Sequence, residues 1–174
     1  MKKITILLIA LTCCFAIQAQ EKETKNKFDV NKLEIGGYFG MSFGNSSSSG
    51  DSYSINIMPQ VGYRFSSMFS VGAGIGYIYR SWNDYSENYA GASIYGRFRP
   101  IRYLSLRAEP QVFRFWGSHS DSRTVPCLLL GAGAIVPMGS NLGMSATISY
   151  DVIRDDYSPY HNGWVYSIGF VYGF

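Results

Sequence analysis

Three consecutive residues carry the side-chain types of a nucleophilic catalytic triad, namely His119, Ser120 and Asp121. In such a triad the histidine takes a proton from the serine hydroxyl, and the carboxylate orients the imidazole. The three groups must converge on one centre, and adjacent residues of a loop seldom do so. We therefore interpret them as solvated loop residues and predict that the protein is not an enzyme.

A second set of residues has the side chains of a metal site. His119, His161, Asp155 and Asp156 all fall in segments that we expect to be loops. Their spacing matches no metal-ligand pattern. The sequence therefore predicts no metal site and no cofactor, and the single cysteine beyond the first twenty residues, Cys127, is most simply a packing residue.

Charged residues are few, at 16% of the chain, and their spacing is informative. If the segments around them are strands, six basic and three acidic residues share one face: Lys32, Glu34, Arg64, Arg80, Arg97, Arg99, Arg107, Glu109 and Asp151. Arg80 and Asp151 fall near one end of the strands and the others near the opposite end. We predict that these side chains form a network of ion pairs in the lumen of a barrel.

The overall charge excludes one class of partner. Without Lys2 and Lys3, 13 basic residues remain against 12 acidic ones, a net charge of +1. Binding to the phosphates of nucleic acid requires a clustered excess of lysine and arginine. We therefore expect no nucleic-acid partner.

The first nineteen residues have the layout of a secretory signal peptide. Lys2 and Lys3 precede an apolar run from Ile4 to Ile17, and small and polar residues follow. The run is shorter than the ~20 residues that a membrane-spanning helix needs. We predict a signal peptide over residues 1–19, a flexible and polar periplasmic leader over 20–31, and one domain over 32–174.

The clearest structural pattern lies at the C-terminus. From Trp164 to Phe174 every second residue is large and apolar, and the residues between them are small. A period of two residues indicates a β-strand with one apolar face. The large residues that follow Trp164 in this alternation are Tyr166, Ile168, Phe170, Tyr172 and Phe174.

Similar alternation predicts seven earlier strands. We place them at about residues 32–44, 53–65, 69–80, 88–99, from 104 onward, 125–136 and 142–152. The pattern slips near Phe113 to Trp116, which suggests a bulge, and the faces of 125–136 stay open because three leucines are consecutive. Connections of about three residues should alternate with loops of about seven to ten residues. This organisation predicts an all-β chain that forms an eight-stranded antiparallel up-and-down transmembrane β-barrel.

The composition of the two faces indicates which one points outward. Glycine, serine and threonine dominate the face opposite the apolar one in several strands, as suits a narrow lumen. Aromatic residues gather at both expected strand ends, as they do at the two interfaces of a lipid bilayer. A soluble lipid-binding barrel, which has the same period, should instead carry many charged residues on its polar face.

The terminal strand resembles the C-terminal signature of bacterial outer-membrane β-barrels, and residues 32–174 resemble the small porin-like barrels typified by OmpX and the membrane domain of OmpA. The resemblance implies a Gram-negative cell outer membrane, with extracellular loops and both termini in the periplasm. It implies that Tyr166, Ile168, Phe170, Tyr172 and Phe174 form the signal for the barrel assembly machinery. Outer-membrane lipid and lipopolysaccharide would surround what we expect to be a monomer.

Four functions fit this architecture. The first is a structural or surface-interaction barrel with an occluded, charge-lined lumen. The second is a narrow pore for small solutes that prefers anions, because basic residues outnumber acidic ones in the expected lumen. The others are a lipid-modifying outer-membrane enzyme and a secreted soluble lipid-binding barrel.

Overall fold

The computed structural model describes residues 29–46, 50–82, 85–117, 120–160 and 163–173. The chain divides into two units, Met1–Val30 and Asn31–Phe174, and the strands belong to the second. The predicted signal peptide and residues 20–28 of the predicted leader lie outside the described residues, so both stay predictions. No helix among the described residues is long and apolar enough to cross a lipid bilayer.

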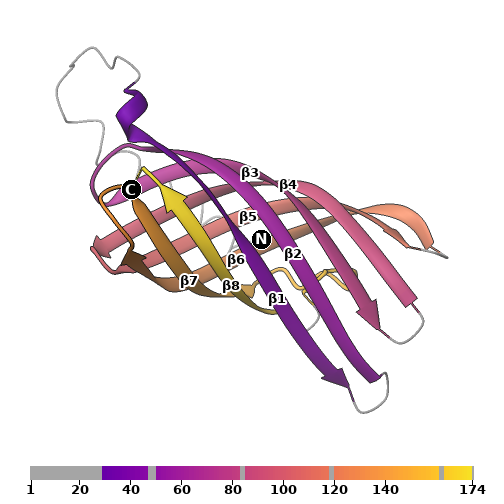
Figure 1. Cartoon of the computed structure of the whole chain (residues 1–174). Helices are drawn as coiled ribbons and strands as arrows, with labels where there is room; N and C mark the ends of the chain where they lie inside the picture. The colour runs from indigo at the N-terminus through magenta and orange to yellow at the C-terminus, as the bar shows by residue number, and fades with distance from the viewer. Residues whose placement is uncertain (1–28, 47–49, 83–84, 118–119, 161–162, 174) are drawn as a thin grey trace, which may run out of the picture. The chain divides into compact units, whose positions relative to one another are not determined.

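Eight antiparallel strands follow a short 3-10 turn, η1 (Val30–Lys32), and close into a barrel in sequence order (Figure 1). They are β1 (Leu33–Ser46), β2 (Gly50–Arg64), β3 (Phe69–Trp82), β4 (Tyr85–Ile101), β5 (Leu104–Gly117), β6 (Ser120–Pro137), β7 (Leu142–Asp151) and β8 (Trp164–Tyr172). The predicted all-β, eight-stranded antiparallel fold is therefore confirmed.

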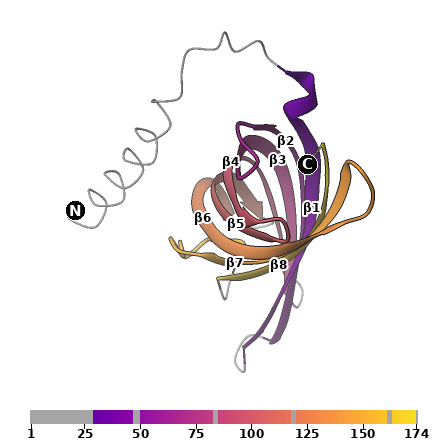
Figure 2. The same ribbon diagram turned by 90° about the vertical axis from the view of Figure 1, so that its left-hand side faces the viewer.

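The barrel closes where the first strand meets the last. β1 pairs with β8 from Ile35 opposite Tyr172 to Met41 opposite Tyr166, and the indigo and yellow strands lie side by side in Figure 1. Figure 2 shows the ring of strands from another side. Closure leaves no unpaired strand edge within this register, so backbone groups are satisfied inside the sheet.

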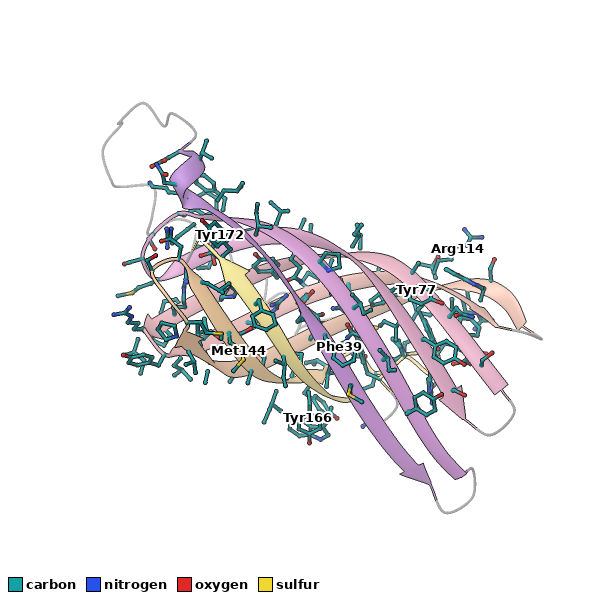
Figure 3. The ribbon with its side chains drawn as sticks, in the orientation of Figure 1. Phe39, Tyr77, Arg114, Met144, Tyr166 and Tyr172 are labelled. Atoms are coloured by element: carbon teal, nitrogen blue, oxygen red, sulfur yellow. The ribbon has the colours of Figure 1, made fainter. Side chains whose placement is uncertain are left out.

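Successive side chains point alternately into and out of the barrel. On β1, Glu34 and Tyr38 are buried inside, whereas Ile35 and Phe39 are exposed outside. Figure 3 shows Phe39, Tyr166 and Tyr172 on the outer surface. The apolar face of the predicted strands is therefore the outer face.

Three of the predicted loops are wrong in length. The polar segments around residues 45–52, 81–87 and 117–124 continue as hairpin strands, with Asn45 opposite Asp51, Ser81 opposite Ser86 and Gly117 opposite Ser120. These strands continue past their apolar residues, because pairing between two strands satisfies the backbone N–H and C=O groups whatever the side chains are. Within the part of the chain that the structure describes, the long irregular connection is the one from β7 to β8, over residues 152–160 and 163.

The structure also resolves two ambiguous patterns. On β5 the side chains keep alternating, since Phe113 and Phe115 point inward and Arg114 points outward. The irregularity predicted near Trp116 is present as a shift of the register with β6 between Phe115 and Gly117. On β6 the inward residues are Val125, Cys127, Leu129 and Ile135. The apparent slip reflects a change in what the interior contains, from polar to aromatic residues.

Candidate functional site

The barrel interior near the turns contains an acid that two cations share. Glu34 on β1 is 1% exposed. Its Oε1 accepts a hydrogen bond of 2.7 Å from Nη2 of Arg99, and its Oε2 lies 3.4 Å from Nη1 of Arg97. Both arginines come from β4, which is not a neighbour of β1 in the sheet. These ion pairs therefore cross the lumen and join opposite walls.

A second buried acid closes a ring of hydrogen bonds. Nη2 of Arg107, on β5, lies 2.7 Å from Oε2 of Glu109, and Nε of the same arginine donates to that oxygen at 2.8 Å. Nη2 of Arg107 also donates to Gln60 at 2.7 Å, and Nε2 of Gln60 donates to Oε1 of Glu109 at 2.9 Å. Each oxygen of the Glu109 carboxylate thus has a close donor, as a buried charge requires.

Two tyrosine rings cover the guanidinium of Arg107. Its Cζ lies 5.0 Å from the ring centroid of Tyr38 and 4.6 Å from that of Tyr95, both within cation–π range. Gly72 makes room for this arrangement, because a Cβ at that position would lie 2.6 Å from the Tyr95 ring. The Tyr38 hydroxyl lies 3.4 Å from each Glu109 oxygen. The ion pair is therefore surrounded within the lumen by aromatic faces.

The other half of the interior, toward the loops, contains a buried apolar cluster. Its buried cluster includes rings from β4 and β5, with Tyr89 and Phe115 centroids 5.1 Å apart. Further members are Met58, Ile78, Phe113, Val125, Cys127, Leu129 and Val165. The predicted faces of the strands do not include this cluster, although unbroken alternation through Phe113 and Phe115 places both rings on the inner face.

A loop residue inserts into this interior. Tyr160, from the connection between β7 and β8, is 2% exposed. Its hydroxyl donates to Oε1 of Gln111 at 2.9 Å, and Nε2 of Gln111 donates to the Tyr38 hydroxyl at 3.0 Å. Burial raises the pKa of the Tyr160 phenol well above its ordinary value, so it remains a neutral donor. Tyr160 therefore lies inside the barrel and is not one of the aromatic residues on the outer surface near the loops.

Asp151 holds the base of the same loop. Its Oδ1 accepts hydrogen bonds from the backbone N–H of Leu128 at 3.0 Å and of Ile153 at 3.2 Å, and its Oδ2 accepts from Ser158 at 2.7 Å. Among the described residues no cation forms an ion pair with it. Its predicted place in a charge network is therefore corrected, because backbone and hydroxyl donors take the positions of a cation.

The remaining predicted lumen charges lie apart from the two buried acids. Arg80 pairs at 3.7 Å with Glu87, an acid outside the predicted set of nine lumen charges. Lys32 lies in η1 and is exposed, and Arg64 donates to the carbonyl of Asn31 at 3.3 Å. Lys32 and Arg64 lie at the end of the barrel where β1 begins and β2 ends, so neither reaches Glu34 or Glu109.

The candidate catalytic and metal-binding residues form no site that the structure describes. His119 and His161 lie outside the described residues, as do the side chains of Ser120 and Asp121. Oδ1 of Asp155 accepts a hydrogen bond from the backbone of Tyr157 at 3.0 Å, as in a turn. No group of three or more potential metal ligands occurs in the described part of the chain.

The predicted assembly signal lies on the outer face of β8. Tyr166, Ile168, Phe170 and Tyr172 are all more than half exposed. Phe174 lies outside the described residues. The four described side chains form a continuous apolar stripe, and their role in assembly stays a prediction.

Comparisons with known proteins agree with this fold. No protein-family model matches the chain, and no curated protein matches its sequence. The outer membrane protein Ail of Yersinia pestis, solved in a phospholipid bilayer nanodisc, is similar in structure with a TM-score of 0.52 and 18% identity, over 80% of this chain and 97% of that one. Neisserial surface protein A has a TM-score of 0.50 and 15% identity, over 82% and 97%. The chain therefore shares the fold of the small eight-stranded outer-membrane β-barrels.

Proposed function

We propose that this protein is an integral outer-membrane β-barrel with an occluded, charge-lined lumen and a structural or surface-interaction role. The observation that carries the proposal is the inverted distribution of side chains. Exposed outward residues such as Ile57, Ile75, Ile94 and Phe170 are apolar, whereas Glu34, Arg97 and Glu109 are buried inside. A soluble protein rarely exposes so continuous an apolar surface to water. An outward apolar band of this kind is typical of β-barrels that span the hydrocarbon core of a bilayer.

Exposed aromatic residues at both ends of the strands support the membrane placement. Phe65, Phe98, Tyr103 and Tyr172 lie toward the turns, and Trp116, Tyr157 and Trp164 lie toward the loops. Such rings prefer the interface between lipid and water. The proposal includes extracellular loops, periplasmic termini, surrounding outer-membrane lipid and lipopolysaccharide, insertion by the barrel assembly machinery, and a monomeric state.

The contents of the lumen support occlusion. Toward the turns the cross-barrel pairs of Glu34 and the ring around Glu109 connect opposing walls. Toward the loops the apolar cluster and Tyr160 fill the interior. An eight-stranded barrel is just wide enough for side chains to fill it. We therefore propose that ions have no continuous path through the barrel.

Recording from single molecules in planar bilayers tests this function. The refolded protein should insert, as judged by a gel mobility that differs between unheated and boiled samples, and should show no steady conductance. Cell fractionation should recover the native protein with outer membranes. A stable conductance from folded protein would contradict the occluded lumen, and recovery in the soluble fraction would contradict the membrane placement.

A narrow pore that prefers anions is the second candidate. The observation that favours it is the excess of cations near the turns, where Glu34 is the partner of both Arg97 and Arg99. A cationic constriction attracts anions and repels cations. In the bilayer experiment this candidate predicts a small, steady conductance whose reversal potential in a salt gradient indicates anion selectivity.

A further inference from the structure

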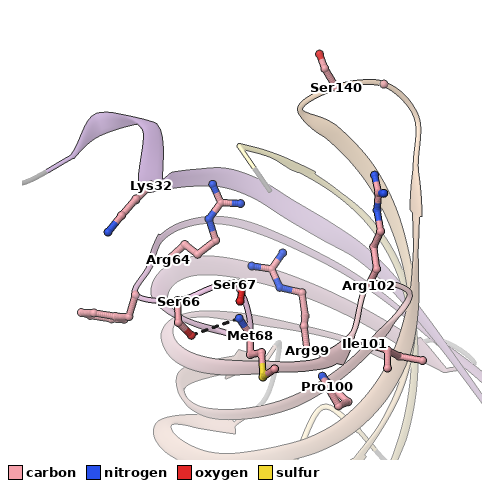
Figure 4. Close-up of a pocket in the computed structure, with 12 residues that line it drawn as sticks. Lys32, Arg64, Ser66, Ser67, Met68, Arg99, Pro100, Ile101, Arg102 and Ser140 are labelled. Atoms are coloured by element: carbon pink, nitrogen blue, oxygen red, sulfur yellow. Dashed lines mark hydrogen bonds between the residues drawn. The ribbon is translucent and has the colours of Figure 1, made fainter. Parts of the chain in front are cut away.

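A pocket of about 690 Å³ lies at the turn end of the barrel. Residues of the β2–β3 turn, of the end of β4 with the β4–β5 turn, and of the β6–β7 connection line it, together with Lys32 of η1 and Arg64 at the end of β2. Its charged lining residues are Lys32, Arg64, Arg99 and Arg102, and the described residues that line it include no aspartate or glutamate. Figure 4 shows these four cations around the pocket.

One of the four cations is built into the protein interior. Arg99 is only 6% exposed, yet it also contributes to the pocket lining. Its Nη2 donates to Glu34, whereas its buried Nε has no hydrogen-bond partner. Buried donors are nearly always paired. This guanidinium therefore has hydrogen-bonding capacity beyond what the described protein residues use.

The acid next to this pocket does not neutralise it. Glu34 already pairs with Arg97 as well as with Arg99. Among the described residues Arg64 donates to the backbone carbonyl of Asn31 and forms no ion pair with a carboxylate. Lys32 and Arg102 are exposed to solvent. Four like charges around one space repel one another, and an anion seated between them would relieve that repulsion.

We propose that this pocket is a binding site for a phosphate group. Guanidinium groups bind phosphate through pairs of parallel hydrogen bonds, and several cations together suit a doubly charged oxyanion. Exposed apolar side chains, Phe65, Met68 and Ile101, stand beside the cations. This combination suits the headgroup of an anionic phospholipid, and a free phosphate compound shares the same chemistry. The site depends on its own residues and not on whether the lumen conducts.

The test compares two double variants of equal charge. Arg64→Gln with Arg102→Gln removes two pocket cations, and Arg114→Gln with Arg154→Gln removes two exposed cations toward the loops as the matched control. All proteins are refolded in a maltoside detergent, which carries no phosphate, and folding is checked by gel mobility. If the Arg64 change prevents folding, Lys32→Gln with Arg102→Gln replaces that pair.

Two probes distinguish the sources of phosphate. Inorganic phosphate is titrated calorimetrically, and retention of phosphatidylglycerol from mixed phosphatidylglycerol–phosphatidylcholine nanodiscs is counted by native mass spectrometry. The pocket variant should bind phosphate roughly tenfold or more weakly than wild type, or lose retained phosphatidylglycerol, while the control matches wild type. Loss in the first measurement alone indicates a free phosphate compound, and loss in the second indicates a lipid headgroup. If wild type binds neither probe, or both double variants behave alike, the proposal is wrong.

Discussion

Arg99 donates a 2.7 Å hydrogen bond to Glu34 across the barrel, from a strand that shares no edge with the strand of its partner. The pair joins β4 to β1 directly through the lumen. In the sheet these two strands are connected only through the backbone hydrogen bonds of the strands between them. Because the same carboxylate also faces Arg97, removing the acid would leave two buried cations without their anion. Cross-lumen pairs are thus part of what holds this barrel in one shape.

The Glu34→Gln variant should be strongly destabilised. Removing one partner of a fully buried ion pair costs about 3 to 5 kcal/mol, and urea-induced unfolding from lipid vesicles would measure the loss. Glu87→Gln is the matched control, because its pair with Arg80 is longer, at 3.7 Å, and less buried. The control should lose no more than about 1 kcal/mol. Equal losses in the two variants would contradict the cross-lumen role.

Glu109→Ala should also destabilise the barrel. The change removes the acceptor of Arg107 and of Gln60 and leaves the guanidinium buried between Tyr38 and Tyr95. We expect a cost of about 3 to 5 kcal/mol in the same unfolding measurement. Replacing Arg107 with Met in the Glu109→Ala background should recover part of that cost, because it removes the unpaired charge. No recovery would indicate that the pair's charges are not the cause.

Tyr160→Phe should destabilise the folded loop while leaving the strands intact. The change deletes the donor to Oε1 of Gln111, and a lost buried hydrogen bond costs about 1 kcal/mol or slightly more. Tyr157→Phe, at an exposed residue of the same loop, should change the free energy of unfolding by less than about 0.5 kcal/mol. Faster cleavage of the loop by protease in Tyr160→Phe alone would agree with this role. Identical behaviour of both variants would argue against an inserted Tyr160.

Spin labels at neighbouring positions of β7 test which face meets lipid. In a Cys127→Ser background, a label at Ile148→Cys should collide readily with oxygen, which concentrates in hydrocarbon, and hardly at all with a polar nickel reagent. A label at Thr147→Cys should be crowded and poorly accessible to oxygen. The expectation follows from the structure, since Ile148 is exposed outside and the side chain before it points inward. In reconstituted protein, nickel access at 147 with a buried 148 would contradict a membrane barrel.

Deleting Phe174 tests the assembly signal. We expect the membrane-inserted fraction to fall several-fold in cells, because the predicted assembly signal would lose one of its five large apolar residues. Ile153→Ala, in the loop between β7 and β8, is the control and should insert normally. The measurement is the heat-modifiable fraction in isolated outer membranes. Normal insertion of the deletion variant would remove the support for this signal.

The number and direction of the strands could be predicted because the alternation of apolar with small or polar residues is visible within each strand by itself. Alternation on β8 from Trp164 to Tyr172, and on β7 from Leu142, is readable without knowing the neighbouring strands. The same alternation gave the wrong strand ends where polar residues continue a strand, as at Ser81 and Ser86. Amino-acid composition does not show whether the backbone of such residues is paired. The prediction from alternation also failed on β5, where Phe113 and Phe115 face an interior whose polarity changes along the barrel.

The alternation of residues along each strand is enough to place five charged residues on the inner face, because a one-residue step always reverses the face of a strand. They are Glu34, Arg97, Arg99, Arg107 and Glu109. Which of these side chains contact one another follows from the three-dimensional arrangement of the strands. Glu34 reaches Arg99 and not Arg64, and Asp151 binds backbone and serine donors instead of a cation. The physical reason is that contacts across the lumen depend on the stagger of strands around the closed barrel and on the path of the loop carrying Tyr160, and neither is encoded in the period of any single strand.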